Sequence, residues 1–469
     1  MGLETAVLER ITEFMNPPQI IRRGYVFRLR GNARAEARLR RFSGCCRKVW
    51  NLALAEQQAR RERGEPYLNY VGMAKWFTAW RSDPATAYLS EAPVHALQNT
   101  LKSLDDAFQR LFKKQGGYPK FKRSGDPVGV RETDVSCFAV DQHNGRVKLP
   151  KVGWLRYRKS RDIDGTPKIV TVTRQLDGWS VSIMADLRVD SRIPEATAIG
   201  AADRGITNFL ATDTGRLVAP LDAHKQSLHR LRRYQRSVAR KIEAAKVAAG
   251  IPKDKPFPKG FKIQASNRLR KAQSRVARIH QKIARQRADF LHKLSAQIAD
   301  THAVFCIEDL KVRNMSASAR GDAESPGRNV KAYPQGVSPP RVAPKALTRA
   351  RKSGLNRSIL DQGWAMWAGM VEYKMQWRGG RLIKVPAAYT SQRCASCGHT
   401  HADNRKSEKF KCLECGHEEH ADINAAKNIL AAGHAVLSGE QPGHAVVEDA
   451  VLSGRPVKRL PTEGLRRAA

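Results

Sequence analysis

The spacing of apolar residues divides the first half of the chain into strand-like and helix-like stretches. Residues 25–30 (YVFRLR) alternate apolar and basic side chains as a strand does, and residues 33–113 repeat apolar positions at the spacing of helical turns. Glycine and proline interrupt this pattern at 116–125, and three short alternating segments follow at 145–158, 168–175 and 178–187. The pattern predicts a small β-barrel whose strands are separated by a helical insertion.

The second half begins with strands and continues with a long pair of helices. Residues 198–218 predict two strands with a turn at Thr214-Gly215, and residues 222–299 place apolar residues along one face of each of two helices. Residues 313–356 are rich in Ser, Gly, Pro and Arg, which predicts a mobile loop or lid. The remaining predicted elements are an apolar strand at 302–310, a helix at 359–379 and a strand at 381–386.

The chain is strongly basic along its whole length. Lys and Arg outnumber Asp and Glu by 84 to 44, which gives a net charge of +40 and a pI near 10.4. Such a surface is typical of a protein that binds a polyanion, so we favour nucleic acid over a membrane or an acidic protein as the partner, although a ribosomal or chromatin-type protein would be equally basic. We find no run of about 18 apolar residues and no secretory signal, so we expect a soluble protein that is not exported.

The predicted helical pair carries the densest positive charge. Its first arm has seven Lys or Arg residues and no acid between 225 and 241, which forgoes the usual helical ion pairs. A solvated helical hairpin would explain the pattern, but we favour a face that binds phosphates. The candidate nucleic-acid-binding residues, including two from the glycine-rich break, are Arg230, Arg232, Arg233, Arg236, Arg240, Lys241, Lys271, Arg275, Arg278, Lys120 and Lys122.

Four of the eight cysteines form a metal-binding motif near the C-terminus. Cys394, Cys397, Cys412 and Cys415 have the spacing CxxC-x14-CxxC, which is close to that of two knuckles closing a tetrahedral zinc site. Four thiolates leave no open coordination position, so we expect one structural Zn²⁺ rather than redox chemistry. The other cysteines are scattered, as in proteins of a reducing compartment.

Three acids lie at the ends of predicted elements. Asp203 ends the strand AIGAAD, Glu308 ends the strand AVFCIE, and Asp422 opens the helix that follows the last cysteine. Metal-assisted cleavage of a phosphodiester needs carboxylates from separate elements that converge around two Mg²⁺ about 3.5–4 Å apart. Any one of these acids could equally be a surface residue at the end of a strand, so the pattern alone does not fix their role.

Three segments together resemble a known family. AADRGITNFLATDTG, CIEDLKVRNM and TSQRCASCG…CLECGHEEHADINAAKNIL are similar to the three split RuvC-type nuclease segments and the zinc ribbon of TnpB. TnpB is the transposon-encoded RNA-guided DNA nuclease, which is closely similar to compact type V CRISPR effectors. The N-terminal half agrees, and the resemblance runs from about residue 22 to residue 432. One departure is His420, at a place where related sequences often have an additional acid.

The resemblance implies a multidomain α/β protein: an RNase H-like RuvC nuclease domain with an inserted zinc ribbon, preceded by a small β-barrel interrupted by a helical recognition domain. The expected parts are an N-terminal extension (1–20), a barrel (21–44 and 114–195), a helical recognition domain (45–113), a nuclease domain (196–390 and 421–432) that includes the basic hairpin 222–299 and the lid 313–356, a zinc ribbon (391–420) and a disordered tail (433–469).

The resemblance also implies an activity. Asp203, Glu308 and Asp422 match the catalytic acids, which would hold two Mg²⁺ or Mn²⁺, and the four cysteines would hold Zn²⁺. The partners would be a guide RNA and a matched target DNA beside a short duplex motif, in a prokaryotic cytosol, without a membrane and with a monomer favoured over a dimer. The alternatives are a guided DNA-binding protein that does not cut, and a cut-and-paste transposase. The zinc ribbon and the lack of a recognisable helix-turn-helix disfavour the latter.

Overall fold

The computed structural model describes residues 19–124, 126–189, 196, 198–252, 255, 257–258, 261, 263, 265–317 and 344–439, with the backbone alone over 344–351. These residues form two compact units. One comprises 19–189 and 227–285, and the other comprises 196–226 and 286–439. The expected N-terminal extension (1–20) falls outside the described residues, apart from its last two positions, and so do most of the predicted lid and tail.

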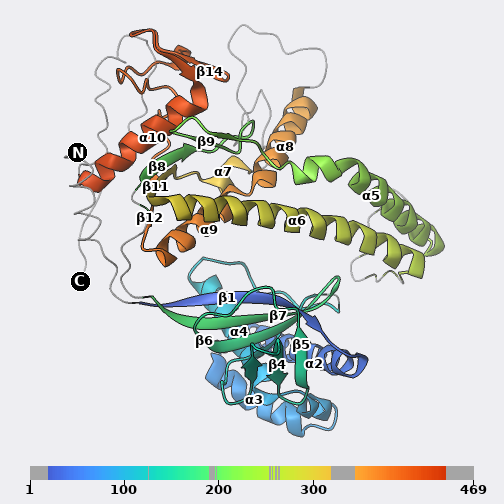
Figure 1. The fold of residues 1–469 in the computed structure, drawn as a ribbon. Helices are drawn as coiled ribbons and strands as arrows, with labels where there is room; N and C mark the ends of the chain where they lie inside the picture. The colour runs from blue at the N-terminus through green and yellow to red at the C-terminus, as the bar shows by residue number, and fades with distance from the viewer. Residues whose placement is uncertain are drawn as a thin grey trace, which may run out of the picture. The chain divides into compact units, whose positions relative to one another are not determined.

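The first unit contains a seven-stranded antiparallel sheet (Figure 1). Its order is β2-β6-β7-β1-β5-β4-β3. The strands are β1 (Gln19–Arg30), β2 (Val130–Glu132), β3 (Ala139–Asp141), β4 (Arg146–Leu149), β5 (Gly153–Tyr157), β6 (Thr166–Gln175) and β7 (Gly178–Val189). Strand β1 pairs with β7 as far as Arg28 and with β5 from Leu29 onward, so it joins the two halves of the sheet. The sheet ends at β2 and β3, and closure into a barrel stays a prediction.

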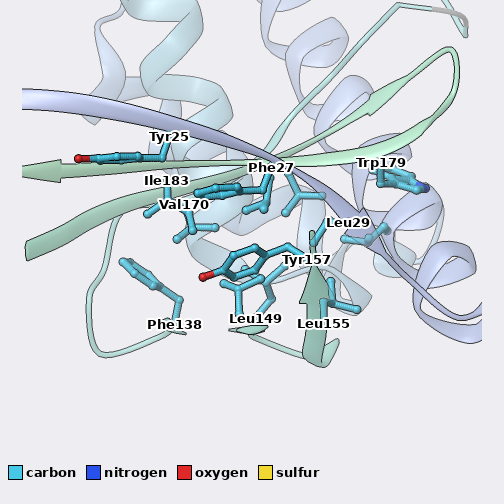
Figure 2. Close-up of a cluster of buried hydrophobic side chains, with 14 of the residues drawn as sticks. Tyr25, Phe27, Leu29, Phe138, Leu149, Leu155, Tyr157, Val170, Trp179 and Ile183 are labelled. Carbon is cyan, nitrogen blue, oxygen red and sulfur yellow. The ribbon is translucent and has the colours of Figure 1, made fainter. Parts of the chain in front are cut away.

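Alternation along β1 builds the core of this sheet. Tyr25, Phe27 and Leu29 are buried, whereas Val26 between them is 59% exposed. Figure 2 shows these side chains gathered with those of β5, β6 and β7, and the ring of Phe27 stacks on that of Tyr157 at a centroid distance of 4.8 Å. The apolar and basic alternation that predicted a strand therefore also explains which face is buried.

The helical insertion consists of α2 (Ala33–Glu62), α3 (Tyr70–Ser82), the 3₁₀ helix η1 (Ala87–Glu91) and α4 (Val94–Phe112). Helix α2 serves two cores, because Ala35 and Leu39 pack with the sheet whereas Phe42 and the residues after it pack with α3 and α4. Residues 33–44, which we had assigned to the barrel domain, therefore form the first part of the helix that the apolar spacing predicted.

The second unit contains a five-stranded mixed sheet in the order β10-β9-β8-β11-β12. Strand β11 runs parallel to β8 and β12, while β8, β9 and β10 are antiparallel. Three strands occupy 198–218, where we had expected two, because the apolar run NFLAT pairs back on β8 before the turn. The strands are β8 (Ala198–Asp203), β9 (Leu210–Thr212), β10 (Leu217–Val218), β11 (His302–Glu308) and β12 (Arg381–Val385).

Helices cover both faces of this sheet. Phe305 and Ile307 of β11 pack with residues of α6 (Asn267–Thr301) and α9 (Trp364–Trp377), whereas Val304 and Cys306 pack with α10 (Ala421–Ser438) (Figure 1). A central strand covered on both faces has a continuous apolar sequence, which is the pattern of AVFCI. Because β8 and β11 are parallel neighbours, their carboxyl ends lie at the same edge of the sheet.

The predicted pair of long helices is present as α5 (Ala223–Ala248) and α6. The lid prediction was wrong at its ends, because Val312–Met315 form the short helix α7 and Pro344–Gln362 form α8. Proline fits the first turn of a helix, where its missing N–H would have no partner in any case, and the following residues of α8 are good helix formers.

The single helix expected at 359–379 is broken. Helix α8 ends at Gln362, and Gly363 takes a left-handed conformation (φ 75°) before α9 begins at Trp364. A β-carbon at Gly363 would lie 3.1 Å from Arg287 Cδ and 3.2 Å from Leu291 Cδ1 of α6. The residue therefore permits both the turn and the close approach of α6.

The region of the two CxxC motifs contains a three-stranded antiparallel sheet in the order β13-β14-β15. Strands β13 and β14 lie between the two motifs, and β15 lies between the second motif and α10. The strands are β13 (Arg405–Lys406), β14 (Lys409–Lys411) and β15 (Glu418–His420), and the 3₁₀ helix η2 (Ala402–Asn404) precedes them. Helix α10 continues to Ser438, so the tail predicted to begin at 433 starts with six helical residues. The alanines in the second half of α10 have a high helix propensity, which favours this extension. None of the described helices is long and apolar enough to cross a membrane.

Candidate functional site

Asp203 and Glu308 are neighbours on adjacent parallel strands. Ala202 of β8 is in register with Ile307 of β11, so the two acids are the next residues along and leave the sheet at the same edge. Parallel pairing requires this, since strands that run in the same direction end together. The structure brings together two acids that are 105 positions apart in sequence.

Asp422 reaches the same place from the first turn of α10. Its helix packs on β8 and β11 through Ile429, and the ring of His420 caps the helix because Nδ1 accepts the Asp422 N–H at 3.2 Å. The Asp422 carboxylate accepts one hydrogen bond from Asn208 Nδ2 (3.4 Å), in the segment after β8. The histidine that departs from related sequences therefore has a structural role here.

The electrostatics of the three acids show that they share one region. Burial, followed by the charges of Glu308 and Asp422, raises the pKa of Asp203 to about 7. Burial also raises the pKa of Glu308, against a hydrogen bond from Thr390 Oγ1 to Glu308 Oε1 at 2.6 Å. Each carboxylate therefore disfavours ionisation of Asp203, as expected for acids gathered without a compensating cation.

Two arginines offset part of this charge. Arg405 of the small ribbon sheet donates from Nη2 to Asp422 Oδ1 at 2.8 Å, and its charge lowers the pKa values of Asp203 and Glu308. Arg204 is buried beside the acids and donates to the backbone carbonyl of Glu308, and its burial lowers its own pKa to about 10. Sequence reasoning missed Arg405, because it lies in a polar stretch that looks like ordinary surface.

The donor set fits hard divalent cations. Three carboxylates in a region of raised pKa supply the oxygen ligands that Mg²⁺ and Mn²⁺ prefer. Among the described residues the three acids do not form a set of ligand atoms within 4.8 Å of one another, whereas the four cysteines do. As they stand, the three carboxylates therefore do not surround a single ion.

The four cysteines form a compact site. Cys394 Sγ lies 3.7 Å from Cys415 Sγ, and Cys397 Sγ lies 3.6 Å from Cys412 Sγ. Four sulfurs at about 2.3 Å from one zinc ion would be about 3.8 Å apart, so the spacing fits tetrahedral Zn²⁺. Gly398 (φ 80°) and Gly416 (φ 71°) complete the two turns in the left-handed conformation.

Two asparagines of α10 connect the first of these turns to the helix that carries Asp422. Asn424 Nδ2 donates to the Arg393 carbonyl at 2.7 Å, and its Oδ1 accepts the Ala395 N–H at 2.9 Å. Asn428 Nδ2 donates to the carbonyls of both Arg393 (2.7 Å) and Thr390 (2.9 Å). The cysteine site is thereby fixed to the elements that position Asp422 and, through Thr390, Glu308.

The candidate phosphate-binding residues remain largely available to solvent. Most are exposed, and among the described residues none forms an ion pair with an acid. Three have other contacts: Lys241 Nζ donates to Ser237, Arg275 lies over the ring of Tyr234, and Lys122 Nζ lies 4.6 Å from the ring of Trp50. These residues belong to the first unit, whereas the three acids belong to the second.

Comparison with known proteins identifies the family. The chain is 38% identical over 453 residues to the "Putative RNA-guided DNA endonuclease InsQ" of Escherichia coli K12, which covers 95% of this chain and 98% of that protein. The chain belongs to the TnpB (IS605 OrfB) family. A family model described as "Probable transposase" matches 182–319, and one described as "Cas12f1-like, TNB domain" matches 364–429, which includes the cysteines and Asp422.

The chain is also similar to three further proteins, over larger or smaller parts of its length. A "Putative RNA-guided DNA endonuclease" of Streptomyces pristinaespiralis is 29% identical, over 88% of this chain and 90% of that protein. The Cas12f1 endodeoxyribonuclease of Sulfoacidibacillus thermotolerans is 48% identical over 86 residues, 18% of this chain and 20% of that protein. A solved Cas12f1–sgRNA–target DNA complex covers 88% of this chain and 99% of that chain, with 14% identity and a TM-score of 0.49.

A third family model, described as "Helix-turn-helix domain", matches residues 15–66. We had found no recognisable helix-turn-helix from sequence. Over the described part of this range, the structure has strand β1 followed by the single long helix α2. The family description and the local fold therefore differ in this segment, and the motif name carries no argument for DNA-end binding.

Proposed function

We propose that the protein is an RNA-guided DNA endonuclease that cuts DNA matched by its guide, with Asp203, Glu308 and Asp422 as its catalytic acids. One observation carries the assignment of the acids: they come from three separate elements and meet at one edge of a mixed sheet, where they raise the pKa of Asp203. Proteins that are similar over nearly the whole chain are named as RNA-guided DNA endonucleases, which supports the guided activity.

The chain's own residues would prepare this site for chemistry. Thr390 holds Glu308 in place, and Asn208 and Arg405 orient Asp422. Bound Mg²⁺ would supply activation of a water nucleophile and neutralise charge at the scissile phosphate. Arg405 would then be free to leave the carboxylate and face the phosphate, because a cation on Asp422 replaces its guanidinium.

The same proposal assigns the remaining parts. The seven-stranded sheet and helices α2 to α4 would form the barrel and recognition domains that hold the guide RNA and the guide–target duplex by its shape. The exposed basic residues of α5 and α6 would bind phosphates, and the four cysteines would hold one structural Zn²⁺. We propose that a monomer in the prokaryotic cytosol carries out the reaction.

The test begins with protein purified from cells that carry its native flanking DNA. The co-purifying RNA is sequenced, and the complex is incubated with Mg²⁺ and a plasmid that matches the guide, beside an unmatched plasmid. We expect a discrete RNA and cutting of the matched plasmid alone. If RNA and matched binding appear without cutting, the protein is a guided binder. Joining of transposon ends without guide dependence would instead indicate a transposase.

Matched substitutions test the acids themselves. Asp203→Asn, Glu308→Gln and Asp422→Asn should each abolish cutting while leaving RNA content and target binding unchanged. Asp309→Asn is the control, since Asp309 follows Glu308 directly but pairs with Lys311 and is not one of the three acids. Cutting by any of the three acid variants at the rate of the Asp309→Asn protein would refute that residue's catalytic role.

A further inference from the structure

A second group of metal-ligating side chains lies in the first unit, apart from the acids and the four cysteines. His95 on α4 meets Asp134 and Cys137, which lie in the turn after β2. Their ligand atoms all lie within 4.8 Å of one another. His95 Nδ1 is 3.5 Å from Asp134 Oδ2 and 3.7 Å from Cys137 Sγ.

These distances suit a shared transition-metal ion. Ligand atoms at tetrahedral Zn²⁺ lie about 3.4 Å apart for nitrogen with oxygen, and about 3.6 Å apart for nitrogen with sulfur, given the usual bond lengths of about 2.0–2.3 Å. A hydrogen-bonded pair without metal would be closer than 3.5 Å for nitrogen and oxygen. The mixture of imidazole, thiolate and carboxylate favours Zn²⁺ over Mg²⁺, which prefers oxygen ligands alone.

An independent observation points to a ligand at the same place. Glu132 is only 3% exposed, and among the described residues its Oε1 has no hydrogen-bond partner. This oxygen lies 3.4 Å from His95 Nδ1, so it is directed at the group. A buried carboxylate oxygen without a hydrogen bond is costly, and a cation bound beside it at His95 would offset that cost.

The surrounding structure holds the turn against the helix. Asn99, one turn after His95, donates from Nδ2 to the Arg131 carbonyl at 3.1 Å and accepts from Thr133 Oγ1 at 3.2 Å. Asp134 Oδ1 accepts the Ser136 N–H at 2.9 Å, which leaves its Oδ2 for the group. The ligand positions are therefore fixed by hydrogen bonds that do not use the ligand atoms.

We propose that His95, Asp134 and Cys137 form a second Zn²⁺ site that fastens the segment after β2 to the start of α4, with a water molecule in the fourth position and the Glu132 carboxylate beside His95. The ion would join the start of α4 to the turn that connects β2 and β3 of the sheet. His95 and Asp134 are half exposed, so a metal ion can enter from solvent.

Metal content tests the site directly. The full-length protein is purified with zinc in the buffer, freed of loosely bound metal on a desalting column, and its zinc per chain is measured by mass spectrometry. We expect Cys137→Ser and His95→Ala to hold one zinc equivalent less than the wild type. His143→Ala, which removes an exposed histidine outside the group, is the control and should hold the wild-type amount.

Cobalt gives a second readout that does not depend on how much metal the four cysteines hold. Co²⁺ added to wild type should give thiolate charge-transfer and four-coordinate ligand-field bands, and subtracting the Cys137→Ser spectrum should leave the share of this site. Zinc should also raise the melting temperature of wild type more than that of Cys137→Ser. Equal zinc content and a featureless difference spectrum in folded protein would overturn the proposal and leave an ion pair between His95 and its acids.

Discussion

Asp203 lies where burial and two neighbouring carboxylates oppose its charge, so its protonation should affect stability as well as metal binding. Its pKa rises from the ordinary value of 3.8 to about 7 in the folded protein. A raised acid pKa stabilises the fold fully below about pH 4, and this contribution is lost as the pH rises to about 7. In protein without Mg²⁺, the charge of Asp203 should therefore lower the free energy of unfolding at pH 8.

Asp203→Asn should stabilise the Mg²⁺-free protein at pH 8 by up to about 4 kcal/mol, which is the free energy that corresponds to a shift of about three pH units. The gain should be much smaller near pH 4, where the carboxyl is protonated in the folded protein and carries no buried charge. Thermal unfolding at both pH values, with zinc retained, measures the difference. A gain that does not change with pH would show that Asp203 is not charged in the folded protein at pH 8.

Arg405 competes with a cation for Asp422, because its guanidinium already donates to that carboxylate. Arg405→Gln should tighten Mn²⁺ binding by roughly five- to thirty-fold, the range expected when a partly buried charged hydrogen bond of about 1–2 kcal/mol is removed. Calorimetric titration measures the affinity. Lys406→Gln is the control, since it removes the same charge one residue away, and an equal change in both variants would attribute the effect to net charge.

At the scale of elements, the break between α8 and α9 depends on one glycine. Gly363→Ala should cost about 1–2 kcal/mol, because the residue has a positive φ and a new β-carbon would press on Arg287 and Leu291 of α6. Gly369→Ala in the middle of α9 should instead stabilise by about 0.5–1 kcal/mol, because open space surrounds that position. Chemical denaturation of both variants compares them, and equal effects would show that the break carries no strain.

The same break shows what apolar spacing can predict. The pattern ILDQGWAMWAGM has helical periodicity on both sides of Gly363, and an isolated glycine is tolerated within helices. What ends α8 is the approach of α6, a tertiary contact that no local pattern contains. The strand AVFCIE was predictable because complete burial leaves a continuous apolar run, whereas the N-terminal part of α8 was hidden by a loop-like composition.

The candidate site was predictable to a similar extent. Three acids at element ends and two CxxC motifs are visible in the sequence, and the family resemblance supplied their shared purpose. The contributions of Arg405, Thr390 and Asn208 were not predictable, because each is an ordinary polar residue in a short strand or a connecting segment until the fold places it beside an acid. Only their positions in the folded structure identify these three residues as part of the site.

At the scale of the whole molecule, a net charge of +40 should make nucleic-acid binding steeply dependent on salt. Replacing Arg232, Arg233 and Arg236 by alanine should lower the slope of log affinity against log salt by about 2–3, since each lost phosphate contact removes about 0.7–0.9. Filter binding of RNA across a salt series measures the slope.

The control for this prediction removes the same charge from side chains that are already paired. Arg22, Arg63 and Lys411 each form an ion pair with an acid, so their replacement by alanine should alter the slope much less. Equal slopes in the two triple variants would mean that overall charge, and not the exposed face of α5, determines binding.

Loss of the cysteine-bound metal should separate cutting from binding. Cys412→Ser should abolish cleavage, because Asn424 and Asn428 of α10 depend on the turn that begins at Cys394. RNA content should remain, since the basic residues lie on the other unit. Parallel assays of cleavage and bound RNA check this, and cleavage at the wild-type rate would show that Asp422 keeps its position without the metal.

Under the proposed function, the state of four thiolates would therefore control an activity that three carboxylates perform. Oxidants react with thiolates, and zinc starvation would leave them without a metal. The turn that contains Cys394 and Cys397 is hydrogen-bonded to helix α10, which presents Asp422. A cell under either stress would keep a protein that still finds its target but no longer breaks it. The same chain would then bind its target DNA without cleaving it, with no change in its guide RNA.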